Sequence, residues 1–130
     1  MLVNKCSRIF RIIVFTSADQ SYADLVIDNI DKGGHVVERL YRNDLIWEGG
    51  HLYKDVGKRC GELSSCLIVD DKGKMIKQQE NFLPILPFHG DLEQDTALME
   101  LCDFLEQNWA SGDMRLVARK WKEKVADLES

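Results

Sequence analysis

The chain has 130 residues, of which 45% are hydrophobic and 30% are charged, a composition typical of one globular domain of ordinary size. Its formal net charge of -5 excludes the basic footprint of a nucleic-acid-binding domain. Its apolar runs are far shorter than the roughly 20 residues that span a membrane, so we expect one soluble domain over residues 1–130 without a membrane segment.

The first predicted strand is the apolar run Ile12–Phe15, which is rich in β-branched residues. Such a continuous run is typical of a parallel strand that is covered on both faces. The polar segment 16–19 follows it, and a helix is predicted next because apolar residues recur at spacings of three and four: Tyr22, Leu25, Val26 and Ile30. Lys32-Gly33-Gly34 is expected to end this helix.

Three more strand signals and a hairpin follow in chain order. Val36–Tyr41 is strand-like, and the pairs Ile46-Trp47 and Leu52-Tyr53 flank Glu48-Gly49-Gly50-His51, which predicts a hairpin turn. Cys66–Val69 is a second buried strand, which polar residues 70–73 follow at once. Phe82–Ile85 is a short further strand, so alternating strands and helices predict an α/β fold with an open, mostly parallel sheet and flanking helices.

Two helices are predicted to close the chain, separated by Ser111-Gly112. One has an apolar face made by Leu98, Leu101, Leu105 and Trp109, and the other, over about residues 113–128, has one made by Met114, Val117, Trp121, Val125 and Leu128. Ser111 or Asp113 is the expected N-cap of the second helix. Its basic residues are diluted by acidic ones, so we interpret them as a solvated helix face: Arg115, Arg119, Lys120, Lys122 and Lys124.

The four cysteines are widely spaced, and no two form a C-x-x-C pair. This spacing does not indicate a zinc site. Cys66 and Cys102 fall in apolar runs, so they are expected to be core thiols in a reducing compartment.

Polar residues that suit phosphate chemistry follow two of the predicted strands. Thr16 comes after the strand Ile12–Phe15, and Asp70 and Asp71 come after the strand Cys66–Val69. Ligands of open α/β sheets bind beyond the carboxyl ends of the strands, where a hydroxyl and backbone amides hold phosphate and carboxylates hold Mg²⁺. Lys54 adds a charge that can neutralise a phosphoryl group. Each residue alone fits an ordinary turn or surface role, but together they predict a common anion pocket between converging strand ends.

This order of segments resembles the C-terminal-domain small phosphatases, also called NLI-interacting-factor-like or Dullard-type phosphatases, of the haloacid dehalogenase superfamily. The resemblance covers about residues 9–109. Thr16-Ser17 falls in the family's second motif, Tyr53-Lys54-Asp55 in its third, and Asp70-Asp71 in its fourth. Asn81-Phe82-Leu83-Pro84-Ile85 and Phe104-Leu105-Glu106 are similar to two later family segments.

The resemblance implies a haloacid dehalogenase-like (Rossmannoid) fold and a phosphoserine/phosphothreonine protein phosphatase that uses Mg²⁺. Thr16 and Lys54 would be catalytic, and Ser17, Tyr22 and Arg42 would bind substrate. Asp70 and Asp71 would bind the metal. The implied partner is a phosphoprotein substrate or another protein, in the nucleus or cytoplasm.

Two departures from the family pattern matter. The fourth motif reads Asp70-Asp71-Lys72-Gly73 where the family usually has Asp-Asn-Ser-Pro. The first motif, Asp-x-Asp, is absent from the whole sequence, and with it the expected nucleophile and general acid. Asp19 is the nearest carboxylate that could substitute for the missing aspartates, but it lies beyond Thr16 in the sequence. We therefore expect an N-terminally truncated, inactive domain. It would lack the first strand of the family's sheet, and its Mg²⁺ site would be incomplete.

Two non-enzymatic alternatives stay open. The presequence-receptor subunit of the mitochondrial inner-membrane translocase has the same fold, and its Trp-Asn-Gly-Glu segment is loosely similar to Phe88-His89-Gly90-Asp91. This alternative implies association with the mitochondrial inner membrane. The other alternative is a dead phosphatase domain that binds a partner, in which Trp47 and Trp109 or Trp121 are either surface anchors or packing residues.

Overall fold

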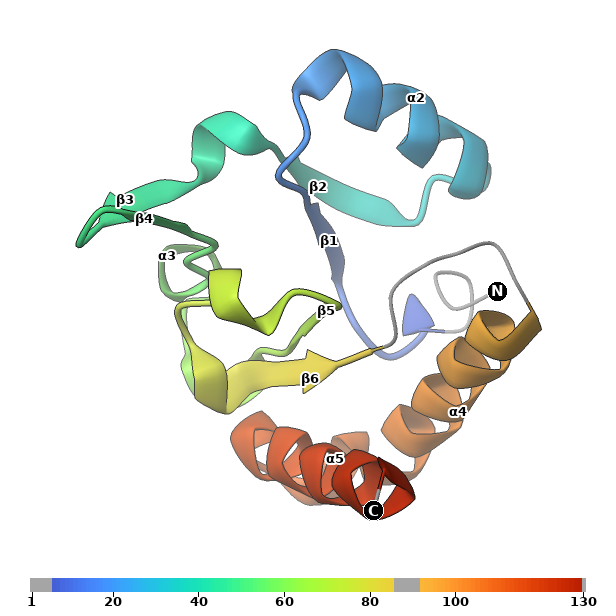
Figure 1. Cartoon of the computed structure of the whole chain (residues 1–130). Helices are drawn as coiled ribbons and strands as arrows, with labels where there is room; N and C mark the ends of the chain where they lie inside the picture. Colours follow the sequence, from blue (N-terminus) through green and yellow to red (C-terminus); the bar gives the residue numbers. More distant parts are fainter. Residues whose placement is uncertain (1–5, 86–91, 130) are drawn as a thin grey trace. The chain divides into compact units, whose positions relative to one another are not determined.

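The computed structural model describes residues 6–85 and 92–129, and the chain forms two compact units, Met1–Lys54 and Asp55–Ser130 (Figure 1). Each unit combines helices with short strands, which confirms the predicted α/β class. Within the described residues, no helix is long and apolar enough to cross a membrane.

The first unit is built on a strand–helix–strand segment. Strand β1 (Ile12–Phe15) pairs in parallel with β2 (Val36–Leu40), and α2 (Gln20–Ile30) connects them (Figure 1). The predicted strands and helix are therefore confirmed within a residue or two of their expected ends. Both carboxylate oxygens of the buried Asp31 accept backbone N–H groups after α2, from His35 at 2.9 Å and Val36 at 2.8 Å. This carboxylate therefore fixes the turn into β2.

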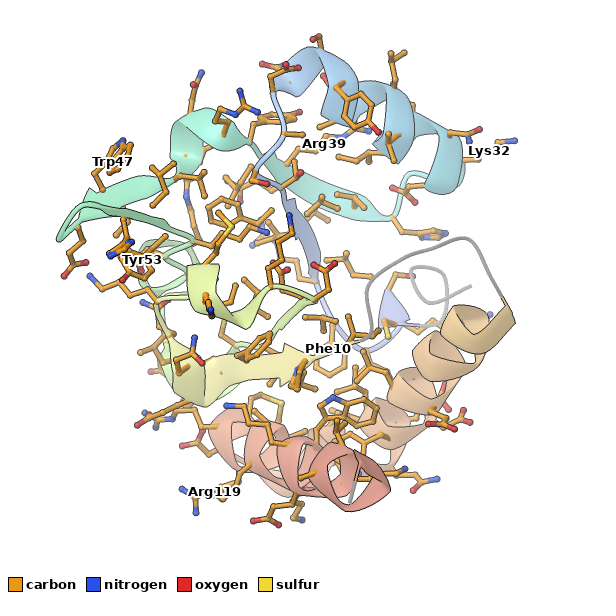
Figure 2. All side chains as sticks on the ribbon, viewed as in Figure 1. Phe10, Lys32, Arg39, Trp47, Tyr53 and Arg119 are labelled. Atoms are coloured by element: carbon orange, nitrogen blue, oxygen red, sulfur yellow. A yellow bond between two sulfur atoms is a disulfide. The ribbon has the colours of Figure 1, made fainter. Side chains whose placement is uncertain are left out.

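A network of polar side chains connects α2 to Arg39 in β2 and to Tyr41, the residue that follows β2. The Tyr41 hydroxyl donates to Asp24 at 2.6 Å, and Arg39 donates to Asp24 at 2.9 Å and to Asp28 at 2.7 Å. Figure 2 shows Arg39 beside α2. The Tyr41 hydrogen bond, aided by Arg39, lowers the pKa of Asp24, and the same bond raises the pKa of Tyr41.

The apolar stripe predicted for α2 is not its buried face. Tyr22, Leu25 and Val26 are 64%, 73% and 42% exposed, whereas Ala23 and Ile27 are buried. The reason is that Asp24, between the two buried residues, is drawn towards β2 by its hydrogen bonds. The helix was predicted correctly, and its orientation was not.

A hairpin completes the first unit. Strands β3 (Ile46–Glu48) and β4 (His51–Tyr53) are antiparallel, as predicted. Gly49 and Gly50 form the turn with φ of 59° and 83°. These left-handed dihedrals at both positions are those that a two-residue hairpin turn requires, and they favour glycine. A 3₁₀ turn over Arg42–Asp44 precedes the hairpin.

The second unit holds another parallel pair and the two closing helices. Strand β5 (Ile68–Asp70) pairs in parallel with β6 (Phe82–Pro84), and short helix α3 (Gly57–Cys60) precedes them. Helices α4 (Leu92–Asn108) and α5 (Met114–Glu129) follow (Figure 1). Asp113 accepts the N–H of Arg115 at 2.9 Å, which agrees with its predicted place at the start of α5.

The core of the second unit joins β5, β6 and α5. Ile68 and Phe82 form one cluster with Val56 and Ile76, and Val117 of α5 is fully buried. Trp121 packs against Phe104 with ring centroids 5.1 Å apart and donates its indole N–H to the Pro84 carbonyl at 2.8 Å. Trp121 is therefore a packing residue and not a surface anchor. Trp47 and Trp109 are 71% and 48% exposed.

Asn81 organises the segment that leads into β5. Its side chain is 1% exposed, and its amide donates to the carbonyls of Leu63 at 2.6 Å and Cys66 at 2.9 Å. One buried side chain thus supplies a donor to the Cys66 carbonyl and a second donor to the Leu63 carbonyl, which also accepts the Cys66 N–H at 3.3 Å.

Two expectations for the strands and one for the cysteines are corrected. The second apolar strand begins at Ile68 instead of Cys66, because Leu63–Ser65 forms a 3₁₀ turn and Asn81 holds the Cys66 carbonyl. β1 is only half-buried, and Val69 is 37% exposed, so neither strand is covered on both faces. Cys66 is not a thiol but forms a disulfide with Cys60, with Cα atoms 5.9 Å apart.

The described strands form three two-stranded sheets, two parallel and one antiparallel. The predicted single, mostly parallel sheet with its first strand missing would join strands of both units. It stays a prediction.

Candidate functional site

The segment between β1 and α2 forms a hydroxyl-lined turn at a helix N-terminus. Thr16 continues the pairing of β1, since its N–H donates to the Leu40 carbonyl at 3.0 Å. Its hydroxyl oxygen accepts the Ala18 N–H at 3.1 Å, which leaves the hydroxyl hydrogen to point at an acceptor. Backbone amides and a hydroxyl at the start of a helix form an arrangement that suits an anion.

Asp19 is the N-cap of α2. Its Oδ1 accepts the N–H of Tyr22 at 3.0 Å and the hydroxyl of Ser21 at 2.8 Å. The Tyr22 N–H, then the Ser21 hydroxyl and the charge of Arg42, lower the pKa of Asp19. A carboxylate with this role stabilises the helix start, and it is ill suited to attack phosphorus.

Arg42 is held against the same turn. Its Nε donates to the carbonyl of Ser17 at 3.0 Å, and its own N–H donates to the Ala18 carbonyl at 3.0 Å. The backbone and one guanidinium nitrogen of Arg42 thus fix its position, while its side chain is exposed. The structure therefore brings Arg42 to the turn that contains Ser17 and Ala18.

Lys54, which directly follows β4, lies near the end of β1. Its side chain is buried, only 6% exposed, and its ammonium lies 5.8 Å from the ring centroid of Phe15, the residue before Thr16. Burial of an ammonium is unfavourable unless polar or aromatic groups compensate it. Lys54 therefore places a cationic side chain beside the residue that precedes Thr16.

Tyr22 lies in the first turn of α2, and its side chain is 64% exposed. Its backbone N–H is bonded to Asp19. The structure therefore places Tyr22 next to the turn, with its side chain exposed.

Asp70 and Asp71 lie at the carboxyl end of β5, in the second unit. Oδ1 of Asp70 accepts the N–H of Lys72 at 2.9 Å, and its carbonyl accepts the N–H of Ile85 at 3.2 Å. Asp71 is exposed in the turn that follows. The predicted convergence of Thr16 with Asp70 joins residues of different units, and it stays a prediction.

The donor set at Asp70-Asp71 fits the chemistry of Mg²⁺. This ion takes hard oxygen ligands and is commonly held by one or two carboxylates together with water and phosphate. Neighbouring carboxylates in one turn supply such oxygens. Across residues 6–85 and 92–129, no group of three His, Cys, Asp or Glu residues has the geometry of a metal site.

The segment after Lys54 is fixed by a residue that the sequence did not single out. Gln78 donates from Nε2 to Asp55 at 2.7 Å and accepts the Val56 N–H at 2.9 Å. Asp55 also accepts the Gly57 N–H at 2.9 Å. No spacing in the sequence signals this pair, because 23 positions separate Gln78 from Asp55. The segment Phe88-His89-Gly90-Asp91 lies outside the described residues.

Comparison with known proteins gives one consistent family. Residues 1–115 match the family model described as NLI interacting factor-like phosphatase. The CTD small phosphatase-like protein 2 of Dictyostelium discoideum is 31% identical over 114 residues, which are 87% of this chain and 20% of that protein.

Two further relatives differ in their described roles. The human carboxy-terminal domain RNA polymerase II polypeptide A small phosphatase 1 is 28% identical over 119 residues, 91% of this chain and 45% of that protein. The mitochondrial import inner membrane translocase subunit TIM50 of Danio rerio is 30% identical over 132 residues, 99% of this chain and 34% of that protein. The chain spans less than half the length of each of these three relatives.

Proposed function

Because the chain belongs to the NLI interacting factor-like phosphatase family, we propose that it is a phosphoprotein-binding domain of the protein serine/threonine phosphatase type. One observation carries this proposal. Thr16, Ser17, Arg42 and Lys54 come from three separate segments of the first unit, and all four lie at or next to the carboxyl end of β1.

Each of these residues has a distinct part in the proposed site. The hydroxyl of Thr16 donates a hydrogen bond to a phosphate oxygen, and the amides of the turn add further donors. Lys54 neutralises charge on the phosphate from within the protein. Arg42 and Tyr22, which are exposed, contact the residue that bears the phosphate, together with Ser17.

In the same proposal, Asp70 and Asp71 hold Mg²⁺, which would neutralise phosphate charge when bound. Asp70 is ordered by the Lys72 N–H, so one of its oxygens is already oriented. A phosphoprotein is the proposed partner, and the nucleus or cytoplasm is the proposed location.

We propose that this chain binds phosphate but does not turn it over. The sequence contains no Asp-x-Asp, so the aspartates that would attack phosphorus and move the proton are absent. Asp19 does not replace them, because its carboxylate caps α2. Groups that only bind the substrate do not replace a lost covalent step.

Binding is tested with a fluorescein-labelled phosphoserine peptide and its unphosphorylated twin. We expect the phosphorylated peptide to bind more tightly, and Arg42→Met to weaken it about tenfold, since a hydrogen bond to a charged group contributes about 1.5–3 kcal/mol. Lys32→Met is the matched control, because Lys32 is an exposed cation beyond the end of α2 (Figure 2). Equal affinity for both peptides would contradict the proposal.

Turnover is tested with p-nitrophenyl phosphate and Mg²⁺. We expect no product above the protein-free rate. Product formed by this chain and abolished by Asp70→Asn would show that another residue supplies the nucleophile.

A receptor role in mitochondrial import is the alternative function. It is favoured by the match to the Danio rerio translocase subunit, which covers 99% of the chain. Fluorescence microscopy of a tagged copy separates the two: a mitochondrial signal supports the receptor, and a nuclear or cytosolic signal supports the phosphatase-type domain.

A further inference from the structure

The second unit has a pocket of about 440 Å³. It lies between the N-terminal half of α5 and the 3₁₀ turn Gln79–Asn81, which precedes β6. Three cations line it, Arg115, Arg119 and Lys122, together with two carboxylates, Glu80 and Asp113. We call it the α5 pocket. The cations follow one another at spacings of four and three residues, which puts them on one face of the helix. The pocket therefore has a net positive lining.

The charges inside the α5 pocket are unevenly matched. Arg115 forms a two-pronged ion pair with Asp113, at 2.7 Å for the closest atoms, and its other terminal nitrogen is 4.0 Å from Glu80. Arg119 has no ion pair within the part of the chain that the structure describes, and it extends away from α5 (Figure 2). An entering anion would therefore meet Arg119 without displacing a carboxylate of the protein.

Lys122 differs from Arg119 because contacts with neighbouring residues fix the position of its ammonium. Its ammonium donates to the carbonyl of Gln79 and lies 5.7 Å from the ring centroid of Phe82. These contacts hold it in the pocket wall, where partial burial lowers its pKa and the charge of Glu80 opposes this effect. A carboxylate beside Lys122 would restore the stabilisation that water provides to an exposed ammonium. Lys122 is therefore not part of a purely solvated helix face.

We propose that the α5 pocket is a docking site for an acidic peptide segment of a protein partner. Leu116, which also lines the pocket and is 48% exposed, offers an apolar contact beside the three cations. A glutamate or aspartate next to a leucine-like residue matches this lining. The net charge of -5 does not forbid it, because charges farther than about 8 Å are screened at physiological ionic strength.

The test uses the full 130-residue chain and a fluorescein-labelled peptide in which glutamates flank a leucine. Fluorescence anisotropy measures its affinity, and a peptide with glutamines in their place is the reference. We expect the glutamate peptide to bind about tenfold more tightly than the glutamine peptide, and less tightly as salt rises.

Charge reversal locates the site. We expect Arg119→Glu to weaken the glutamate peptide about tenfold, because an attraction becomes a repulsion. Lys120→Glu is the matched control, since Lys120 is the exposed neighbour on the same helix and does not line the pocket. Both substitutions are at exposed positions, and equal melting temperatures will show that both variants are folded.

Three outcomes would overturn the proposal. Equal loss of affinity in both variants would indicate diffuse attraction to the helix. Displacement of the peptide by an equal concentration of inorganic phosphate would indicate a site for small anions. Absence of binding would exclude the site. Arg42→Met should bind the glutamate peptide like the unchanged chain, which separates this site from the proposed phosphate site.

Discussion

At the scale of single residues, several polar side chains form hydrogen bonds with backbone groups next to the helices and strands. Asn81 satisfies two carbonyls before β5, and Asp31 satisfies two N–H groups before β2. Asp19 caps α2 at the edge of the proposed phosphate site. The energetic importance of these residues comes from the cost of leaving a buried polar group without a partner.

Asn81→Asp should destabilise the protein by about 1–3 kcal/mol, because the buried side chain keeps its shape but no longer donates to the Cys66 and Leu63 carbonyls, and the Cys66 carbonyl loses this donor. Urea unfolding, followed by circular dichroism, measures the loss. Asn108→Asp is the control, since Asn108 is less buried and donates to one carbonyl only, that of Phe104 at 2.7 Å. A loss for Asn108→Asp as large as that for Asn81→Asp would contradict this account.

At the scale of elements, α2 shows what local patterns decide and what they do not. The presence of this helix and its end just before Lys32-Gly33-Gly34 follow from nearby residues, and so do the glycine turn of the hairpin and the start of α5. The face that α2 buries depends on Tyr41 and Arg39, which are 17 and 15 positions from Asp24. Such distant hydrogen bonds leave no periodic signal.

The same limit applies to the candidate site. The segments that carry Thr16, Arg42 and Lys54 are recognisable in the sequence, and the structure brings these three residues to one end of β1. The sequence did not reveal the Cys60–Cys66 disulfide or the support that Gln78 gives to Asp55. Both depend on how turns place side chains, and neither leaves a recognisable pattern.

The attachment of α2 should be sensitive to acid. The pKa of Asp24 is lowered chiefly by the Tyr41 hydroxyl, and that of Asp31 by the N–H groups of Val36 and His35. Both fall below the ordinary value of 3.8, so their stabilisation is complete above pH 3.8 and is lost as the pH falls through the lowered values.

Urea unfolding at a series of pH values measures this loss. Tyr41→Phe removes the main donor to Asp24 and should make the loss shallower. Tyr53→Phe, which removes a hydroxyl from the hairpin of the same unit, should leave the pH dependence unchanged. Identical curves for both variants would show that Asp24 does not contribute.

At the scale of the whole molecule, the buried apolar residues are unequally divided. Of those that the structure describes, Cys6, Ala23, Ile27 and Leu40 belong to the first unit. All the others belong to the second, including the fully buried Leu83, Leu101 and Val117. The first unit also exposes several large apolar side chains: Tyr22, Leu25, Val26, Val37 and Trp47. Its folding free energy therefore has the smaller hydrophobic contribution.

Native-state hydrogen exchange should reflect this division. Local opening is easiest where few apolar groups are buried. We expect the amides of α2 to exchange faster than those of α5 around Val117 and Ala118, which mass spectrometry of peptic fragments resolves. Slower exchange in α2 than in α5 would mean that the polar network around Asp24 outweighs the apolar core.

The three tryptophans differ in exposure to solvent, so their fluorescence can report on different parts of the protein. Trp47, the only indole of the first unit, is 71% exposed, whereas Trp121 of the second is 4% exposed beside Phe104. A water-soluble quencher such as iodide will reach the first and not the second, while Trp109 lies between these extremes at 48%. Emission at long wavelength therefore follows the hairpin, and emission at short wavelength follows the core around α5, without any attached dye.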